Sequence, residues 1–409
     1  MDATFVLSLR PRLCEFLSRF DDCFASRPTR KAFAGYITGQ LSELPRKSME
    51  PMADAAGVHP RSLQQLMSLY VWDEDQLRDR LQQYVAQQHP SEHSVGIVDE
   101  TSVVKKGRHT AGVQRQHCGA VGKQENCVVT VHLGYTTPDF RTLIDGELFL
   151  PEESWHQDRP RCRAAGIPDD VVYRPKWMIA LEQLDRARRN GLRLRWLTFD
   201  EGYGGKPPFL RALDARGQDY VAEIPSSFRV WTHEPRVVRR EHATHRRPGR
   251  PRRLPRLAKQ TLPQCEVRWA LRVSSVVRAA AWVVFHTSDG EKGPMLWEVK
   301  RISVWLSDAE GLPTREHQLL VVRRLPDRTE VKYFLSGASS STSTEELLLV
   351  AFSRWKIERT FEDAKTELGL ADFEMRKWKC VRRHLIASCV SHAFLATVRR
   401  EEEKKGRPN

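Results

Sequence analysis

The sequence predicts an α/β protein with a mixed sheet and flanking helices, an all-helical N-terminal region and a β-rich insertion. Three observations lead to this fold class. Residues 1–90 place apolar side chains at helical intervals, and strand-like runs begin near residue 94. From there the predicted order is three strands, helix, strand, helix, strand, which is typical of a mixed α/β sheet. Residues 226–335 then return to strand-like segments before helices resume.

The all-helical region, residues 1–90, contains a candidate DNA-binding unit. The segment MADAAGVHPRSLQQLMSL (52–69) has a small residue, a turn glycine and apolar positions where a helix-turn-helix needs them. If this unit reads DNA, Arg61 and Gln64 face the duplex. An ordinary helical hairpin would explain the pattern equally well.

Residues 91–225 are expected to form the first part of the sheet domain. The strand SVGIVDE ends in Asp99, and GVQRQHCG, NCVVTVHLGYTT and FRTLIDGELFLP suggest an antiparallel meander. PKWMIALEQLDRARRNG reads as a helix that stops at Gly191. The strand in LRLRWLTFDEGYG ends at Asp200, and a helix in PPFLRALDARG and a strand in DYVAEI follow.

The remaining chain divides into a basic insertion, a second part of the sheet domain and a tail. The insertion, 226–335, has strand-like segments WALRVSSVV, AAWVVFHT, RISVWLS, HQLLVVRR and VKYFLSG. The linker GASSSTSTEE leads into a long helix, for which Ser343 and Glu346 provide a capping box. Residues 336–400 hold this helix and a last one, and residues 401–409 form a frayed tail.

The chain carries a concentrated positive charge. Its 66 basic and 52 acidic residues give a net charge of +14 and a pI near 9.6. Residues 236–260 hold ten basic residues and one acidic residue, a local +9, so the rest carries about +5. Phosphate contacts release counterions and dominate affinity for nucleic acids, so this distribution favours a polyanionic partner over a merely basic surface.

Several classes of protein are excluded by missing patterns. No run of eighteen apolar residues and no secretion signal is present, so we expect a cytoplasmic protein without a membrane partner. The eight cysteines form no CxxC pair, which argues for reduced thiols and against zinc. GxSxG and GxxxxGK[ST] motifs are absent, which argues against a serine hydrolase and a nucleotide-phosphate loop. His384, Cys389 and His392 share a helix face, but their apolar neighbours favour core packing.

Three carboxylates are candidates for chemistry. Asp99 and Asp200 follow buried apolar runs, where an unpaired charge is costly and a bound cation would remove that cost. Either aspartate could instead cap a following turn. In RWKIERTFEDAKTELGL (354–370) Glu358 shares a stripe with Arg354 and Lys365, one residue out of phase with the apolar stripe, so it is expected to border the core. A salt-bridged surface helix would also fit, at about 0.2–0.5 kcal/mol per pair.

Three carboxylates from separate elements suit a pair of Mg²⁺ ions. Such ions bind through oxygen, and together they can activate a water or a 3′-hydroxyl and stabilise the leaving oxygen of an in-line phosphoryl displacement. Arg354 and Lys365 would then offset charge and contact phosphate near the scissile bond.

Four sequence blocks, in the correct order, resemble bacterial insertion-sequence DDE transposases of the DDE superfamily endonuclease group. VDETSVVKKG…VQRQHCGAVGKQENC resembles the first-aspartate block, and FDEGYGG the second. Arg-Trp-x-Ile-Glu-x-x-Phe-x-x-x-Lys before ELGL resembles the glutamate signature, and FEMRKW with SHAFLA the region after it. The resemblance covers roughly residues 90–225 and 335–400.

The resemblance implies an RNase H-like core that uses Mg²⁺, or Mn²⁺ in its place, and no small-molecule cofactor. Asp99, Asp200 and Glu358 would take the catalytic, metal-binding positions, and Arg354 and Lys365 the supporting ones. The implied activity is cut-and-paste transposition, with cleavage at terminal inverted repeats and strand transfer into target DNA. Such transposases usually pair two ends, which implies a homodimer on double-stranded DNA, associated with the bacterial nucleoid.

One position departs from the family pattern. The tyrosine often found three residues before the signature arginine is Ala351 here, which puts its hydrogen bond in doubt but not the metal site. A β-rich insertion recurs in relatives, and 358 − 200 = 158 residues leave room for one. The alternative function is a catalytically silent, transposase-derived DNA-binding or regulatory protein.

Two basic segments are also expected to contact DNA. Lys105 and Lys106 belong to the first-aspartate block. The arm RRPGRPRR should be extended, because its prolines prevent helix and central strand. It resembles the Gly-Arg-Pro core of AT-hooks, which insert an arginine into narrow A·T minor grooves; a non-specific phosphate-binding loop is the alternative. The arginines concerned are Arg246, Arg247, Arg250, Arg252 and Arg253.

Overall fold

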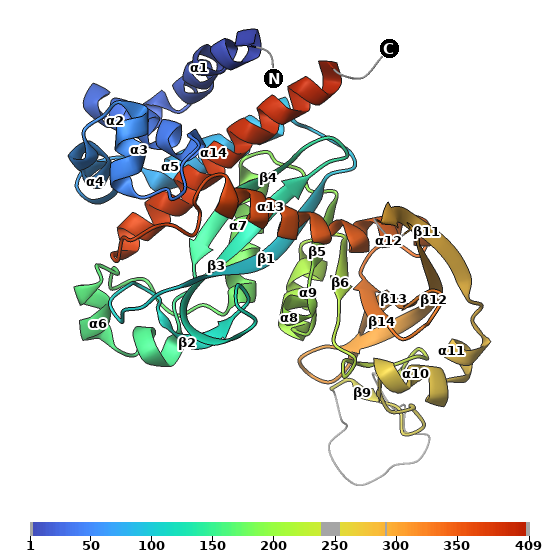
Figure 1. The fold of residues 1–409 in the computed structure, drawn as a ribbon. Helices are drawn as coiled ribbons and strands as arrows, with labels where there is room; N and C mark the ends of the chain where they lie inside the picture. The colour runs from blue at the N-terminus through green and yellow to red at the C-terminus, as the bar shows by residue number, and fades with distance from the viewer. Residues whose placement is uncertain (1–2, 239–253, 291–292, 406–409) are drawn as a thin grey trace. The chain divides into compact units, whose positions relative to one another are not determined.

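A computed structural model describes residues 3–238, 254–290 and 293–405 of the chain (Figure 1). The chain divides into two compact units. The first comprises residues 1–195 and 355–409, and the second comprises residues 196–354. Each unit contains strands, helices and buried apolar side chains of its own.

The first unit begins with helices, continues with antiparallel strands and ends with two helices from the C-terminal part of the chain. Its elements are α1 (Ala3–Ser18), η1 (Asp21–Cys23), α2 (Arg27–Leu41), α3 (Met49–Ala56), α4 (Pro60–Ser68), α5 (Glu74–Gln88), β1 (Val95–Val104), β2 (Gln114–Cys118), β3 (Lys123–Thr136), β4 (Arg141–Leu148), η2 (Glu152–His156), α6 (Arg159–Ala164), α7 (Lys176–Arg189), α13 (Trp355–Thr366) and α14 (Trp378–Lys405).

Strand β3 is the centre of the sheet in this unit. It pairs antiparallel with β1 on one side, and with β2 and then β4 on the other, which confirms the predicted meander. The middle of β3 is a continuous run of buried residues, as expected for a strand whose two faces are both covered. Helix α7 packs on β3, and its Gln183 side chain donates to the Val131 carbonyl at 2.9 Å.

Buried polar bonds attach the N-terminal helices to α14. The Tyr36 hydroxyl of α2 lies 2.7 Å from Nδ1 of His384. The fully buried Arg383 donates to the Leu66 carbonyl at the end of α4 and to the Trp72 carbonyl beyond it. The polar groups of these side chains are removed from water, so they need hydrogen-bond partners within the fold. The helical region is therefore packed into the first unit.

The second unit combines a short parallel pair with a long antiparallel run. Its elements are β5 (Trp196–Phe199), α8 (Glu201–Gly204), α9 (Pro207–Ala215), β6 (Tyr220–Glu223), β7 (Arg229–Val230), β8 (Val237–Val238), β9 (Arg256–Leu257), β10 (Cys265–Glu266), α10 (Val267–Val273), α11 (Ser275–Ala279), β11 (Val283–Gly290), β12 (Gly293–Ser307), β13 (Pro313–Arg324), β14 (Val331–Ser336) and α12 (Thr344–Ser353).

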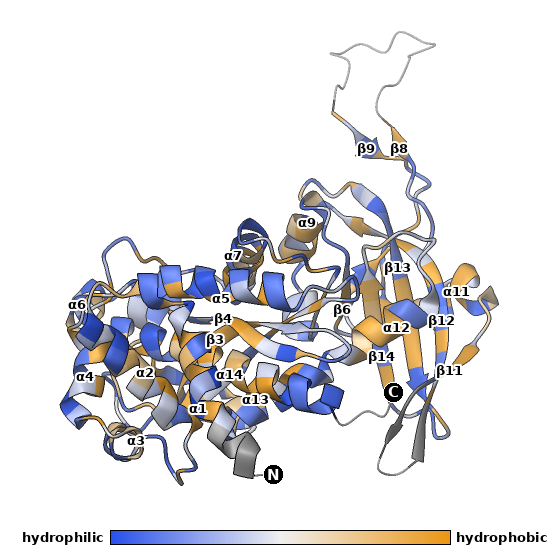
Figure 2. Cartoon of the chain, turned by 90° about the horizontal axis from the view of Figure 1, so that it is seen from above, coloured by the Kyte–Doolittle hydropathy of each residue, from blue (hydrophilic) through white to orange (hydrophobic). Residues whose placement is uncertain are grey.

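The strands of the second unit follow the order β5, β6, β14, β13, β12, β11. Strands β5 and β6 are parallel, and the later pairs are antiparallel, so the sheet is mixed. Figure 2 shows much of β13 and β14 in the colour of hydrophobic residues, which matches their buried runs. The predicted fold class is confirmed: the chain is an RNase H-like α/β protein with a mixed sheet, flanking helices and an all-helical N-terminal region.

One predicted strand is wrong. The segment WALRVSSVV forms helices α10 and α11. Across residues 267–279 the buried positions Val267, Ala270, Ser274 and Val277 recur at helical intervals, and the Ser274 hydroxyl caps α11 by accepting from the Val277 N–H. The preference of valine for strands is weak and depends on its surroundings. Packing and the helix cap therefore determine that this segment is helical.

The C-terminal helices also differ from expectation. The predicted long helix ends at Ser353, and a turn at Arg354 separates α12 from α13. The Ser353 hydroxyl donates to the Val350 carbonyl at 2.7 Å, a contact that commonly bends helices. Ser343 caps α12 as predicted, accepting from the Glu346 N–H at 3.1 Å. Helix α14 extends to Lys405, so the start of the expected tail is helical.

Within the described ranges, no helix has both the length and the apolar character that crossing a membrane requires.

Candidate active site

Asp99 lies inside β1, not at its end as predicted, because the strand continues to Val104. The aspartate pairs with His132 of β3. Its carboxylate is half-buried and accepts the Glu100 backbone N–H at 2.7 Å. The long partner strand explains the difference, because cross-strand pairing outweighs the weak strand preference of aspartate.

Helix α13 packs on the face of the sheet to which Asp99 belongs. Side chains alternate between faces along a strand, and directly paired residues share a face. Ile97 pairs with Gly134 two residues away from the Asp99–His132 pair, so all four positions belong to one face. Phe361 of α13 meets His132 edge-on, with ring centroids 5.2 Å apart. The aspartate and α13 therefore lie on the same side of the sheet.

Gly134 lets α13 approach β3 closely. A Cβ at this position would lie 2.5 Å from Cδ1 of Ile357, closer than side-chain carbons pack. We predict that Gly134→Ala displaces α13 and lowers the free energy of unfolding by about 1–3 kcal/mol. Ile357→Val removes the colliding methyl group and should cost about 1 kcal/mol alone.

The double variant tests this packing. Urea unfolding of Gly134→Ala with Ile357→Val should show a loss clearly smaller than the sum of the two single losses, because the two residues compete for the same space. Additive losses would show that the alanine methyl group and the isoleucine do not meet.

Glu358 is exposed on α13, which corrects the expectation that it borders the core. The predicted stripe of Ile357, Phe361 and Ala364 is buried. One residue along an α-helix turns the side-chain direction by about 100°. Glu358 therefore leaves the buried stripe but stays on the helix that covers the face of Asp99.

Lys365 is electrostatically coupled to Asp99. Burial lowers the pKa of Lys365, and the Cys118 thiol and the Asp99 carboxylate oppose that lowering. The predicted partner Arg354 belongs to the second unit, where its Nε lies 3.6 Å from a carboxylate oxygen of Glu223. Lys365 and Arg354 therefore have different charged neighbours: Asp99 acts on Lys365, and Glu223 lies beside Arg354.

Asp200 directly follows β5 in the second unit, as predicted. Its Oδ1 accepts the backbone N–H groups of Gly202 at 3.0 Å and Tyr203 at 3.4 Å, which makes it the N-cap of α8. The capping alternative considered for this aspartate is thus realised. A cap also fixes the orientation of the half-buried carboxylate.

A family model described as a DDE superfamily endonuclease matches residues 19–288, more than half of the chain. The chain belongs to the DDE superfamily endonuclease family. The matched range includes Asp99 and Asp200 and ends before Glu358. The assignment of the glutamate thus depends on the signature around it and on the position of α13.

A curated relative of this DDE endonuclease is the "Probable transposase for insertion sequence element IS701" of Microchaete diplosiphon. The two are 27% identical over 233 residues, which is 56% of this chain and 56% of the relative. The chain spans about half the length of the curated relative it matches.

The residues predicted to bind metal have suitable chemistry for Mg²⁺. All three offer carboxylate oxygens, the ligands that this hard cation prefers. Asp99 and Asp200 are half-buried and Glu358 is exposed. Asp99 and Glu358 belong to the first unit and Asp200 to the second. Among the residues that the structure describes, no three His, Cys, Asp or Glu side chains are gathered into a metal-binding group.

The segment predicted to be a helix-turn-helix unit has two helices joined by a short turn. Helix α3 ends at Ala56 and is capped by Gly57, whose φ of 64° is left-handed and favours glycine, and α4 follows after a short turn. Leu63 and Leu66 of α4 are buried. Arg61 and Gln64 are both exposed, one turn apart. Their availability to a partner agrees with the predicted DNA-reading role, which stays a prediction.

Lys105 has an unexpected partner within the first unit. Its ammonium donates to the backbone carbonyl of Phe373 at 2.5 Å. The same ammonium lies 3.6 Å from the centroid of the Phe373 ring. Burial lowers the pKa of Lys105 to about 8. A phosphate contact would compete with this bond, whereas Lys106 is exposed. The arm arginines Arg246, Arg247, Arg250, Arg252 and Arg253 lie outside the described residues.

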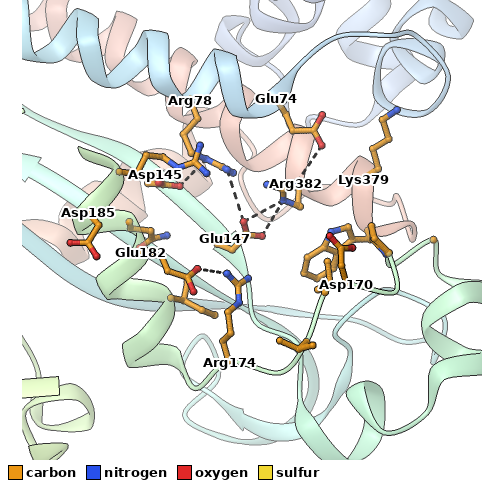
Figure 3. A pocket seen from close by; sticks show the side chains of 18 of the residues that line it. Glu74, Arg78, Asp145, Glu147, Asp170, Arg174, Glu182, Asp185, Lys379 and Arg382 are labelled. Atoms are coloured by element: carbon orange, nitrogen blue, oxygen red, sulfur yellow. Dashed lines mark hydrogen bonds and ion pairs between the residues drawn. The ribbon is translucent and has the colours of Figure 1, made fainter. Parts of the chain in front are cut away.

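A cavity of about 680 Å³ in the first unit is lined by charged side chains, most of which pair with one another or with neighbouring residues (Figure 3). Glu147 lies between Arg382, at 3.2 Å, and Arg78, at 4.0 Å, and Glu182 accepts from Arg174. Six basic and six acidic side chains line it, a formal charge of zero. This cavity is therefore a junction between α5, β4, α7 and α14 and has no net attraction for DNA.

The histidines of α14 are core residues, as expected. Burial lowers the pKa values of His384 and His392 to about 4, so both are neutral near pH 7. His384 lies between Tyr36 and the Leu370 carbonyl, and His392 contacts the Thr142 hydroxyl at 3.1 Å.

Two glycines that position the candidate site were not predicted from the sequence. Gly134 seats α13, and Gly204 lets α8 approach β6, where a Cβ would lie 2.9 Å from the Glu223 carbonyl carbon. The signal was present for Gly134, because a lone glycine within a strand pattern often marks a close approach.

Proposed function

We propose that this DDE endonuclease is a cut-and-paste transposase of an insertion sequence. The observation that carries the proposal is the placement of Asp99 and the Glu358-bearing helix α13 on one face of the sheet, with Lys365 in the field of Asp99. Family membership and the similarity to a transposase support it.

In this proposal Asp99, Asp200 and Glu358 are the catalytic carboxylates and hold two Mg²⁺ ions, for which Mn²⁺ can substitute. When bound, the metal would activate the attacking oxygen and stabilise the leaving one. Lys365 and Arg354 would hold the phosphate being attacked. The half-buried positions of the two aspartates strengthen these electrostatic interactions relative to water.

The proposed reaction has two phosphoryl transfers. Water first adds its oxygen to a phosphorus atom at the element end, and the 3′-oxygen leaves with a proton as a 3′-hydroxyl. That hydroxyl then attacks a target phosphodiester, and the target's own 3′-oxygen departs. The DNA partners would be the terminal inverted repeats and target DNA, read in part by Arg61 and Gln64, with the protein acting as a homodimer.

The test uses purified full-length protein and a plasmid that carries this gene with its native flanks. We expect double-strand release of the element with Mg²⁺ or Mn²⁺ and none with EDTA, and sequencing of the products would define the ends. Tight binding to the flanks without release under any metal condition would overturn the catalytic proposal and favour a silent DNA-binding protein.

A further inference from the structure

A second, smaller cavity in the first unit lies where α13, α14 and the β3–β4 hairpin meet. Its volume is about 150 Å³, and the hairpin contributes residues 136–141 to its wall. Arg400 near the end of α14 donates to Asp139 in the hairpin at 2.8 Å, which joins α14 to the hairpin. The predicted catalytic residues do not line this cavity.

The cavity has a surplus of positive charge. Four basic and three acidic side chains line it, a formal charge of 4 − 3 = +1. They are Arg141, Lys356, Arg399, Arg400, Asp139, Asp363 and Glu403. One phosphodiester, with a single negative charge, would neutralise this lining. The 680 Å³ cavity has no such surplus, so the two cavities differ in the ligand that their charge favours.

Lys356 and Arg141 each have a donor that no acceptor among the described residues satisfies. Asp363 is shared by Arg141 at 3.2 Å and Arg399 at 2.9 Å. Across residues 8–238, 254–286 and 296–405, no hydrogen bond or ion pair joins the Lys356 ammonium to another side chain or carbonyl. Nε of Arg141 is buried, and no residue that the structure describes accepts a hydrogen bond from it. Both residues line the cavity, where an anionic oxygen would be a favourable acceptor for them.

The position of Lys356 has an electrostatic cost without a ligand. Its ammonium shares this small cavity with the guanidinium of Arg141, a second cation. A desolvated cation beside a second cation is stabilised when an anion binds between them.

We propose that this cavity binds a backbone phosphate of DNA through the ammonium of Lys356 and the guanidinium of Arg141. A volume of about 150 Å³ is roughly that of five water molecules in the liquid, which is enough for a phosphate group. The proposal rests on the proposed function, because it places the bound strand on the enzyme beside the candidate active site.

The site would hold the strand a few nucleotides from the cleaved bond. Arg141 pairs with Thr136, four residues along β3 from His132, which pairs with Asp99. Four strand residues span roughly 13 Å. In duplex DNA, about 13 Å measured along the helix axis is about four base-pair steps of 3.4 Å.

The first test compares Lys356→Gln with Arg359→Gln, a matched control that removes an exposed charge from the same helix, where Arg359 pairs with Glu362. Binding of fluorescent duplex DNA would be measured by anisotropy across a series of KCl concentrations. Loss of one phosphate contact should weaken binding and reduce the slope of log K against log[KCl] by about 1 for Lys356→Gln only. Equal slopes for the two variants would overturn the proposal.

The second test places a neutral methylphosphonate at one position after another in the duplex. The wild-type protein should lose affinity at one position near the cleaved bond, and Lys356→Gln should not respond there. Equal responses of both proteins at every position would contradict a direct phosphate contact. Lys356→Gln should unfold at a temperature no lower than wild type, since an uncompensated cation is removed, so that weaker binding is not a folding defect.

A third measurement distinguishes a phosphate of DNA from free phosphate as the ligand. It also distinguishes failure of the cavity proposal from failure of the catalytic proposal. Inorganic phosphate, compared with chloride at equal ionic strength, should raise the unfolding temperature of the wild type but not of Lys356→Gln. This response without any DNA effect would overturn DNA as the ligand in favour of free phosphate. If all three arms behave as expected but no metal condition gives DNA cleavage, the cavity proposal stands and the catalytic one fails.

Discussion

Replacing Asp99 by asparagine should abolish DNA cleavage and leave DNA binding intact. Asparagine keeps the size of the side chain and the acceptor for the Glu100 N–H, so β1 should keep its pairing with β3. It removes the negative charge that a divalent cation needs. A loss of about 4 kcal/mol of transition-state stabilisation corresponds to about a thousandfold in rate. Release from the flanked plasmid and anisotropy with the flanking DNA measure the two effects.

Glu100→Gln is the matched control for this prediction. It makes the same chemical change one residue further along β1, on the opposite face of the sheet, where Glu100 pairs with Lys176 of α7 at 2.7 Å. Cleavage should survive in this variant. Cleavage by Asp99→Asn at the wild-type rate would contradict the catalytic assignment. Equal losses of cleavage in both variants would show that any such change in β1 impairs the protein, whichever face of the sheet it is on.

Gly204→Ala should destabilise the second unit and reduce cleavage with it. A Cβ on Gly204 would lie 2.9 Å from the carbonyl carbon of Glu223 and closer still to its oxygen. Because this obstacle is backbone, it cannot rotate away, and α8 must move from β6. We expect a loss of about 3 kcal/mol in the free energy of unfolding. The shift would disturb the cap that Asp200 provides for α8 and the Glu223 carboxylate beside Arg354.

Gly107→Ala is the control for the glycine prediction. A Cβ at Gly107 would have no neighbour within 4 Å, so this change should alter the free energy of unfolding by at most about 0.5 kcal/mol. Urea unfolding and the release assay, applied to both variants, measure the effects. Gly204→Ala with wild-type stability would show that α8 does not rest on the Glu223 backbone.

The element types were largely predictable because most segments carry a clear period or a stop signal. The strands β2, β3 and β4 and the helix α7 match their predictions, and the end of α7 matches the left-handed Gly191 that follows it. The predictions failed where long-range partners decide. Strand β1 runs past Asp99 because β3 offers a partner, and α10 and α11 form where the local residues favour strand.

The chemical candidates were visible in the sequence, but their surroundings were not. Signature spacing picked out Glu358 and Lys365, yet no local pattern shows that Glu358 is exposed or that Lys365 lies in the field of Asp99. Lys356 was not singled out at all, since a lysine on a charged helix looks like a solvated residue until its buried surroundings are known.

The sequence alone determined the fold class, the family resemblance and the identity of the candidate carboxylates. These follow from hydrophobic periodicity and motif spacing, which are local along the chain. The tertiary structure alone decided that α13 covers the Asp99 face, that two glycines permit close packing, and that Lys356 and Arg141 share a cavity. These features depend on contacts between residues far apart in the chain, and neither burial nor the charge that surrounds a side chain is encoded by its neighbours in sequence.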